Sequence, residues 1–336
     1  MAQKCNYRQA VQELRRAASV VLTAHVKPDG DALGSMMALR RWLLAEGKHV
    51  EVIVPTAPPR KYAFLDPERS VKVAGREVDA ASVERSDLVC LVDTGAWQQL
   101  EGVEALVRNA AFRLVIDHHQ TQDDLADFML VDSEAAATAT LVYAILSEAG
   151  AVIDAEIATC LFAGLAADTD WFRLPTTDAE TLRLAATLLE AGARPDRIHE
   201  EMFWNDDLAK IHLLGRAVET MRPALGGRVM VMRLTQDMFR EVGADAGDTE
   251  NLINECMKVR GVLVGLMLVE TGNGYVRVSL RSRPGTDILG VATHFGGGGH
   301  QRAAGARLKG PLPEVENAVL AALKSLLDAP QSGLLS

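Results

Sequence analysis

The 336-residue sequence lacks long apolar runs, cysteine motifs, internal repeats and low-complexity segments. No stretch approaches the ~20 apolar residues of a membrane-spanning helix, and segment 1–21 does not have the pattern of a signal peptide. The four cysteines are scattered and form no CxxC pair, which argues against a disulfide framework. A reducing, cytoplasmic location is therefore expected.

The sequence also has no excess of basic charge, since 35 basic and 45 acidic residues give a formal net charge of -10. Proteins that coat long nucleic acid carry a basic surface, so we expect no long nucleic acid as a partner. Short oligonucleotides and small nucleotides stay open as partners, and no membrane is expected. The acidic balance suits a protein that gathers carboxylates around metal ions.

Apolar strand-like runs alternate with helical patterns in the first half of the chain. The predicted strands and helices lie, in chain order, at 19–25, 32–47, 49–55, 86–94, 112–119, 137–150 and 155–168. Such alternation indicates an α/β fold with a parallel sheet flanked by helices.

The second half predicts a smaller domain. A polar helical segment at 186–214 is expected to link a first domain, 1–185, to a second α/β domain, 215–330. Strand patterns return there, and a predicted helix at 312–329 follows a glycine-rich turn at 296–299.

Acids and histidines stand at the ends of four apolar elements. They are His25, Asp29 and Asp31 in AHVKPDGDALGS, Asp93 in LVDTG, Asp117, His118 and His119 in VIDHH, and Asp168 in AADTD. The carboxyl ends of parallel strands meet along one crevice, so these side chains can converge on one site. Imidazole and carboxylate ligands without thiolate suit a divalent ion such as manganese, iron, cobalt or zinc. The candidate ligands exceed what one ion needs, which predicts two ions that share a bridging carboxylate.

Each of these residues alone also has an ordinary structural explanation. An aspartate at a strand–helix junction is commonly an N-cap, so Asp168 could be a cap and Asp31 could cap a helix that begins at Ala32. Independent caps do not explain the four motifs together, each after an apolar run. We therefore favour the metal site.

In order and spacing, the four segments resemble the motifs of the DHH phosphoesterases, and the resemblance covers nearly the whole chain. It implies a hydrolase with two divalent metal ions, most favourably Mn²⁺, and an active site in the cleft between the two domains. The implied ligands are His25 and Asp29 for one ion and Asp31, His118 and Asp168 for the other, with Asp93 as the bridge. A hydroxide between the ions would attack phosphorus.

The resemblance also implies roles for two further residues of the third motif. His119 would contact the scissile phosphate or protonate the leaving group, and Asp117 would orient an imidazole from behind. One departure concerns the fourth motif, where relatives of this size have glycine and this chain has Asp170, followed by Trp171 and Phe172. The loop shape there stays open, and the two aromatic residues are expected to be packed, with base stacking as the alternative.

Two segments of the second domain predict phosphate binding. The strand GYVRVSLRSR places arginines on one face, of which Arg281 and Arg283 are candidate ligands for substrate phosphate, while Arg277 is expected to be solvated. The segment THFGGGGHQRAAGA predicts a backbone nest for an anion. It resembles the GGGH motif of the DHH-associated (DHHA1) domain, which implies that substrate contacts Gly297, Gly298, Gly299 and His300.

Several functions are compatible with these motifs. The resemblance favours a phosphodiesterase for short oligoribonucleotides (nanoRNA), a type that often also acts on 3′-phosphoadenosine 5′-phosphate. A stand-alone cyclic-dinucleotide phosphodiesterase is the main alternative, and a nucleotide-binding regulator without catalysis is disfavoured by the intact ligand set. A pyrophosphatase would lack GGGH, and a RecJ-type exonuclease would be longer and more basic. Homodimers are common in the family, so a homodimer stays open.

Overall fold

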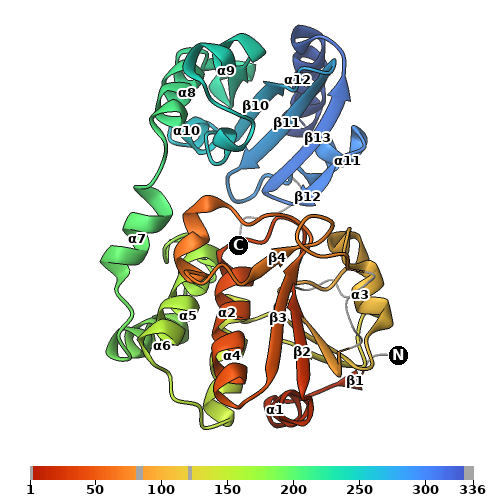
Figure 1. Cartoon of the computed structure of the whole chain (residues 1–336). Coiled ribbons are helices and arrows are strands. Elements are labelled where there is room, and N and C mark those ends of the chain that lie inside the picture. The colour runs from red at the N-terminus through yellow and green to blue at the C-terminus, as the bar shows by residue number, and fades with distance from the viewer. Residues whose placement is uncertain (1–2, 81–85, 120–122, 329–336) are drawn as a thin grey trace. The chain divides into compact units, whose positions relative to one another are not determined.

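The computed structural model describes residues 3–80, 86–119 and 123–328. The chain divides into two compact units, Met1–Asn205 and Asp206–Ser336, each with its own sheet and core (Figure 1). The boundary lies inside the segment predicted as a helical linker. Within the described residues, no helix has the length and apolar character needed to cross a bilayer.

A parallel sheet forms the centre of the first unit, as the alternating pattern predicts. Its described strands are β1 (Gln3–Lys4), β2 (Ser19–Thr23), β3 (His49–Val54), β4 (Val71–Val73), β5 (Leu88–Val92), β6 (Arg113–Asp117) and β7 (Phe128–Val131). They lie in the order β1-β7-β6-β5-β2-β3-β4, and every pair is parallel. The chain therefore leaves all strands at the same edge of the sheet.

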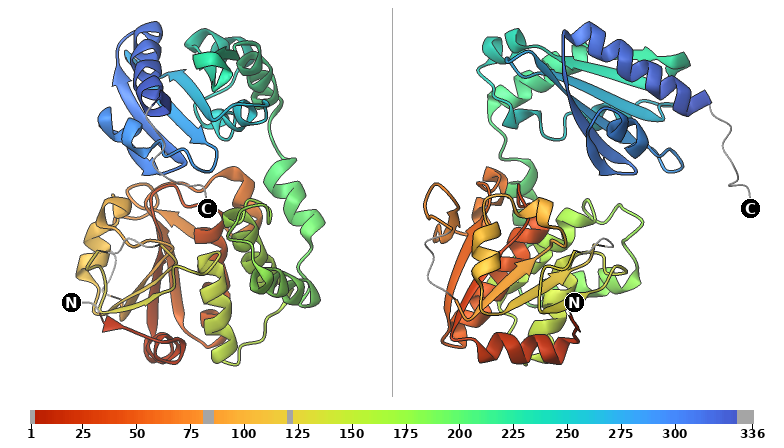
Figure 2. Two further views of the ribbon diagram at one scale, coloured as in Figure 1. Left: turned by 180° about the vertical axis from the view of Figure 1, so that it is seen from behind. Right: turned by 90° about the vertical axis from the view of Figure 1, so that its right-hand side faces the viewer.

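Helices cover both faces of this sheet (Figure 2). The described ones are α1 (Tyr7–Arg16), α2 (Gly30–Ala45), η1 (Arg60–Leu65), η2 (Trp97–Leu100), α3 (Glu104–Asn109), α4 (Thr138–Glu148), α5 (Ala155–Asp168), α6 (Ala179–Glu190) and α7 (Pro195–Phe203). Helices α1, α2, α4 and α5 share one apolar core with the sheet, and α3 and η2 pack on the other face. The short helices α3, η1 and η2 were not predicted from the sequence.

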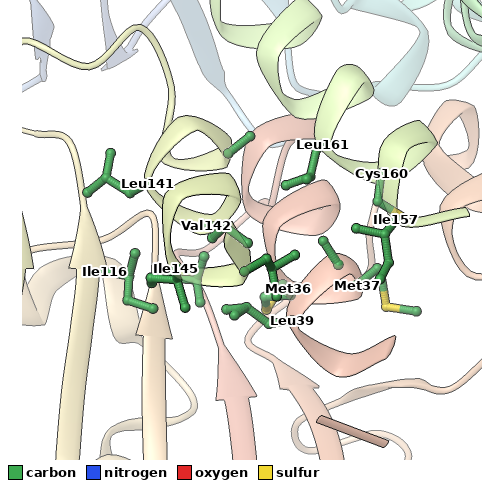
Figure 3. Packing of buried hydrophobic residues seen from close by; sticks show 14 of the residues in the cluster. Met36, Met37, Leu39, Ile116, Leu141, Val142, Ile145, Ile157, Cys160 and Leu161 are labelled. Carbon is green, nitrogen blue, oxygen red and sulfur yellow. The ribbon is translucent and has the colours of Figure 1, made fainter. Parts of the chain in front are cut away.

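Helices α2 and α5 pack against each other in the apolar core, where Met37 and Ile157 are seen (Figure 3), and glycines let the two helices approach closely. A Cβ atom at Gly34 of α2 would overlap the carbonyl oxygen of Cys160 and lie 3.1 Å from the backbone nitrogen of Gly164. A Cβ atom at Gly164 would lie 2.9 Å from Oδ1 of Asp31. The two glycines thus bring the first turn of α2 and the last turn of α5 together.

The second unit contains a mixed sheet with a helical layer on each face. Its described strands are β8 (Arg222–Ala224), β9 (Val229–Leu234), β10 (Val264–Glu270), β11 (Tyr275–Ser282), β12 (Gly298–His300) and β13 (Ala303–Lys309). Its described helices are α8 (Leu208–Glu219), η3 (Leu225–Gly227), α9 (Gln236–Val242), η4 (Gly247–Thr249), α10 (Asn254–Met257), α11 (Leu289–His294) and α12 (Leu312–Asp328). The order is β12-β13-β11-β10-β9-β8, in which only β9 and β10 are parallel among the described pairs. Side chains of α11 and α12 pack on one face and those of α8, α9 and α10 on the other.

The structure corrects the prediction for the glycine-rich segment. The turn after α11 consists of Phe295 and Gly296, the latter with a positive φ of 72°, and an edge strand begins at Gly298. The next strand, β13, was missed because alanine and glycine have low strand propensity. Pairing with β11 and β12 holds it in the sheet despite this sequence.

We expect Gly34→Ala to lower the free energy of unfolding of the first unit by about 1–3 kcal/mol, because an added methyl group must force α2 and α5 apart. Gly215→Ala is the matched control. It lies in α8, where a Cβ atom would meet nothing within 4 Å, and it should stabilise α8 by about 0.5–1 kcal/mol. Urea unfolding followed by circular dichroism measures both changes. An unchanged unfolding midpoint for Gly34→Ala would contradict the close approach.

Candidate metal centre

The predicted metal ligands lie at the carboxyl edge of the parallel sheet. Strands β6, β5 and β2 are neighbours there. His25 follows β2, Asp93 comes directly after β5, and His118 comes directly after β6. These side chains are brought together although almost 100 residues of sequence separate the first from the last, as expected for parallel strands.

One group of potential metal ligands consists of His25, Asp29 and Asp93, whose ligand atoms all lie within 4.8 Å of one another. His25 Nε2 lies 3.9 Å from Oδ1 of Asp29 and 3.5 Å from Oδ2 of Asp93. His25 Nδ1 lies 2.8 Å from the carbonyl oxygen of Val26. Since a carbonyl oxygen only accepts, this contact assigns the proton to Nδ1 and leaves the Nε2 lone pair for a cation.

A second group consists of Asp31, His118 and Asp168, again with ligand atoms within 4.8 Å. His118 Nε2 lies 2.9 Å from Oδ2 of Asp168. The other ring nitrogen, Nδ1, lies 3.1 Å from the carbonyl oxygen of Ala135, so the same assignment of the proton to Nδ1 applies. Each histidine is thus fixed by a backbone carbonyl and turns its second nitrogen toward carboxylates.

The capping alternatives for Asp31 and Asp168 are wrong. Asp29 is the N-cap of α2, since its Oδ1 accepts from the backbone nitrogens of Asp31 at 3.0 Å and Ala32 at 3.1 Å. Asp31 already lies inside the first helical turn, and Asp168 is the last residue of α5. The observed cap lies two residues before Asp31, a difference that the sequence pattern does not resolve because either acid can precede the periodic apolar positions.

Asp93 belongs to the first group and also faces the second. Its Oδ2 atom faces His25, whereas its Oδ1 atom lies 3.7 Å from Nε2 of His118 and 3.7 Å from Nδ1 of His119. Asp93, His118 and His119 also form a third group of potential ligands. The backbone of Asp93 has a φ of 58°, a conformation that costs about 1–3 kcal/mol for a residue other than glycine and often marks functional sites.

His119 is held by Asp117, the last residue of β6. His119 Nδ1 lies 2.7 Å from Oδ1 of Asp117, which is fully buried. The backbone nitrogen of His118 also donates to this oxygen, at 2.9 Å. The hydrogen bond to Asp117 raises the pKa of His119, so this imidazole favours the protonated form.

The electrostatics of both groups favour bound positive charge. Burial and the charges of Asp93 and Asp168 raise the pKa of Asp31 well above its usual value. Burial opposes protonation of His25 and His118, but hydrogen bonds to Asp93 and Asp168 outweigh it and raise their pKa values to about 9 and about 10. Clustered carboxylates therefore draw protons to the site, and a divalent cation supplies the same charge. The residues fit such a cation in donor type as well.

Two residues that contact the carboxylates were not predicted from the sequence. Thr138, at the start of α4, donates its hydroxyl to Oδ1 of Asp93 at 3.0 Å and its backbone nitrogen to Oδ2 of Asp31 at 2.6 Å. Ser35 Oγ donates to Oδ1 of Asp31 at 3.2 Å. The only signal in the sequence was a threonine near the start of the predicted helix 137–150, which also suits an ordinary helix start.

The loop after Asp168 contains Asp170 at the position where relatives have glycine, and its backbone has a conformation that favours glycine. Asp170, Trp171 and Phe172 have positive φ values of 48°, 59° and 64°, the region in which glycine is favoured. The Asp170 carboxylate accepts a hydrogen bond from Arg173 Nε at 2.7 Å. Trp171 and Phe172 pack against the ring of Phe162, with centroids 6.0 and 5.5 Å away. Packing of these two aromatic residues is therefore confirmed.

The two arginines of β11, Arg277 and Arg281, and Arg283 just after the strand differ in their contacts. Arg283, a predicted substrate ligand, donates to the backbone carbonyls of Val262 at 2.7 Å and Met257 at 2.9 Å. Arg277, expected to be solvated, is half-buried and donates to the hydroxyl of Thr249, so that expectation is wrong. Arg281 is also half-buried, and it forms no ion pair with any described residue. Burial lowers its pKa, as expected for a cation without a counter-charge.

The sheet register of the second unit places three of the predicted substrate ligands, Arg281, Gly298 and His300, on one face. Residues opposite each other in antiparallel strands have their side chains on the same face. Two such rows cross β11, β13 and β12, namely Arg281, Ala303 and His300, and Ser279, Gly305 and Gly298. Arg281 and His300 thus lie on either side of small residues of β13. Their backbones are about 10 Å apart, which is two strand spacings.

The glycines of this segment have different surroundings. Gly297 and Gly299 lie against the backbone of β13, where Cβ atoms would meet Gly305 and Ala303. A Cβ atom at Gly298 would meet nothing within 4 Å. Close packing therefore requires the outer two glycines, and the middle one leaves open space on the face of His300.

Comparisons with known proteins agree with this architecture. A sequence model of the DHH family, N-terminal domain, matches residues 19–165, and one of the DHHA1 domain matches 226–329. The chain is 32% identical over 309 residues to the bifunctional oligoribonuclease and PAP phosphatase NrnA of Thermus thermophilus, covering 92% of this chain and 90% of that protein. It belongs to the DHH family.

Two further DHH relatives cover most of the chain. The Bacillus subtilis protein with the same name is 26% identical, over 86% of this chain and 89% of that protein. The crystal structure of an exopolyphosphatase-related protein from Bacteroides fragilis has a TM-score of 0.90 at 25% identity, and covers 96% of this chain and 97% of that one. Membership of this family confirms that the chain is a phosphoesterase, a hydrolase of ester bonds.

We expect Asp93→Asn to weaken Mn²⁺ binding at two sites at once, since its two oxygens face different ligand groups. The loss should exceed about 100-fold, because replacing groups behind metal ligands already costs about 10–100-fold. Isothermal titration of chelator-treated protein measures both affinities. Asp29→Asn, which removes a ligand from one group, should affect one site, and an equally restricted loss in Asp93→Asn would contradict the shared role.

Proposed function

We propose that this chain hydrolyses short oligoribonucleotides to nucleoside monophosphates and converts 3′-phosphoadenosine 5′-phosphate to AMP, using two divalent ions, most favourably Mn²⁺. The first unit is proposed as the catalytic domain and the second as the substrate-binding domain. The observation that carries the proposal is the position of Asp93 between two His–Asp groups in a DHH-family chain. The similarity to bifunctional oligoribonuclease and PAP phosphatase over most of the chain supports this substrate class and does not favour the cyclic-dinucleotide alternative.

The proposed ligands follow the observed groups. His25 and Asp29 would hold one ion and Asp31, His118 and Asp168 the other, with Asp93 shared between them. Divalent ions bound there supply positive charge against the phosphoryl oxygens and make water a stronger acid. The protein contributes fixed geometry, because the histidines are held by backbone carbonyls and Asp31 by donors from two helices.

His119 is the proposed contact to the reacting phosphate. Its side chain is 34% exposed, whereas Asp117 behind it is buried. With Nδ1 hydrogen-bonded to Asp117, Nε2 is the nitrogen that can donate to a phosphoryl oxygen or pass a proton to the leaving oxygen. The raised pKa of His119 favours the protonated form that both tasks need.

The face that contains Arg281 and His300 is the proposed site for substrate phosphate or sugar. Arg281 lacks a carboxylate partner among the described residues, and a phosphate would provide one. The small residues between the two side chains leave room for the ligand, and Gly298 adds open space. Arg283 is a weaker candidate because its guanidinium already donates to two carbonyls. Binding a second part of the substrate here would limit the length that is accepted.

A substrate panel tests the proposed function. Purified protein, treated with chelator and then given Mn²⁺, is assayed on a diribonucleotide, a 5-mer, 3′-phosphoadenosine 5′-phosphate, cyclic di-AMP and pyrophosphate. We expect turnover of the diribonucleotide and of 3′-phosphoadenosine 5′-phosphate, and none with chelator alone. Activity without metal would overturn the two-ion scheme. Preference for cyclic di-AMP or pyrophosphate would overturn the substrate assignment.

We expect His300→Ala to raise the KM for the diribonucleotide by about 10–100-fold, the range for a lost hydrogen bond to a charged group. Bound metal, measured by atomic emission on the purified variant, should be unchanged. His294→Ala is the matched control, since His294 is an exposed histidine of α11 in the same unit and should leave KM unchanged. Loss of metal in His300→Ala would show that the residue belongs to the other site.

A further inference from the structure

Thr138 contacts carboxylates from both ligand groups. It is the first residue of α4 and is fully buried. Its hydroxyl donates to Oδ1 of Asp93 and its backbone nitrogen to Oδ2 of Asp31, at 3.0 and 2.6 Å. Asp31 and Asp93 belong to different groups of potential metal ligands, so one residue joins the two groups.

The hydroxyl of Thr138 is the one neutral donor to the Asp93 carboxylate within the described part of the chain. The other polar side-chain contacts of that carboxylate are nitrogens of His25, His118 and His119 at 3.5–3.7 Å. The Asp93 backbone is in the left-handed region, and such a conformation persists only where the surroundings hold it. At 3.0 Å the hydroxyl is the shortest polar side-chain contact of the Asp93 carboxylate among the described residues, and it favours the orientation in which Oδ2 faces His25 and Oδ1 faces His118.

The backbone of α4 orients the carboxylate of Asp31 as well. Oδ1 of Asp31 accepts from Ser35 Oγ and from the backbone nitrogen of Ala139 at 2.9 Å, whereas Oδ2 accepts only from Thr138 among the described residues. A carboxylate oxygen has about two lone-pair positions. The remaining acceptor capacity of Asp31 is thus on Oδ2, beside Thr138. The positive end of the α4 dipole stabilises the charge of this buried carboxylate.

We infer that Thr138 is a positioning residue that sets the spacing of the two metal-ligand groups through Asp31 and Asp93. This inference rests on the proposed two-ion function. Without the hydroxyl, the Asp93 side chain loses its fixed orientation. Metal binding must then order this side chain, and the entropy cost of doing so weakens the affinity. Because Asp93 faces both groups, the loss reaches both ions. Substrate contacts of the second unit do not involve this residue, so KM should not change.

Valine and serine substitutions separate the hydroxyl from the shape of Thr138. We expect Thr138→Val to weaken Mn²⁺ binding by about 10–100-fold and to lower kcat with an unchanged KM. Thr138→Ser retains the hydroxyl donor, so its Mn²⁺ affinity should stay within about threefold of the wild type. This change is smaller than the loss expected when a donor behind a metal ligand is removed. Affinity is measured by isothermal titration of chelator-treated full-length protein, and kinetics with the diribonucleotide at saturating Mn²⁺.

Thr140→Val is the matched control in the same helix. The Thr140 hydroxyl is buried without a hydrogen-bond partner in the described structure, so its removal should leave Mn²⁺ affinity unchanged. Circular dichroism checks that each variant is folded. If Thr138→Val is unfolded, Thr138→Ala compared with Thr138→Ser makes the same test, since both are smaller than threonine and only serine has the hydroxyl.

The outcomes distinguish the inference from the proposed function. Wild-type Mn²⁺ affinity in Thr138→Val would overturn the inference while leaving the proposed function intact, and so would equal losses in the valine and serine variants. Wild-type protein that neither binds Mn²⁺ nor hydrolyses the diribonucleotide would overturn the proposed function itself. A loss in Thr138→Val that serine rescues and Thr140→Val does not share supports the positioning role.

Discussion

Repulsion between buried carboxylates is the interaction that the first unit has to balance. Asp31 and Asp93 are almost fully buried, and the charges of Asp93 and Asp168 both act on Asp31, in surroundings where unscreened like charges repel strongly. Three kinds of group offset this repulsion. They are histidines at the ends of β2 and β6, the amino end of α4, and hydroxyls from α2 and α4. The proposed divalent cations would complete this balance. Stability and metal binding of this unit would then be linked, because a bound ion would remove a repulsion that folding otherwise retains.

The candidate ligands could be selected from the sequence because each of them is adjacent to a strong local pattern. Asp93 and His118 follow uninterrupted apolar runs, and the edge of a parallel sheet is where such ends meet. The position of Asp168 followed from a helix that ends where the apolar periodicity ends. The chemical roles of these residues stay predictions. Their spatial grouping is what the structure adds.

Other features depend on contacts that no local pattern encodes. Thr138 reaches Asp31 and Asp93 only because α4 begins beside both, and the cap at Asp29 instead of Asp31 depends on the path of the preceding loop. The alternation of β11 placed Arg277, Arg281 and Arg283 alike, yet tertiary neighbours give them three different sets of partners. Strand β13 was missed because its alanines and glycine favour no strand by themselves.

The glycine contact between α2 and α5 has a consequence for how the chain tolerates changes in length. Gly164 makes room for Asp31, and Asp168 follows it four residues later, on the same face of α5. One inserted or deleted residue between them would turn Asp168 by about 100° around the helix axis and away from His118. His25, by contrast, lies in the loop between β2 and α2, and a loop can absorb such a change. Helix α5 cannot absorb it, because every residue there is part of the helix. The number of residues between Gly164 and Asp168 is therefore as important as their identity.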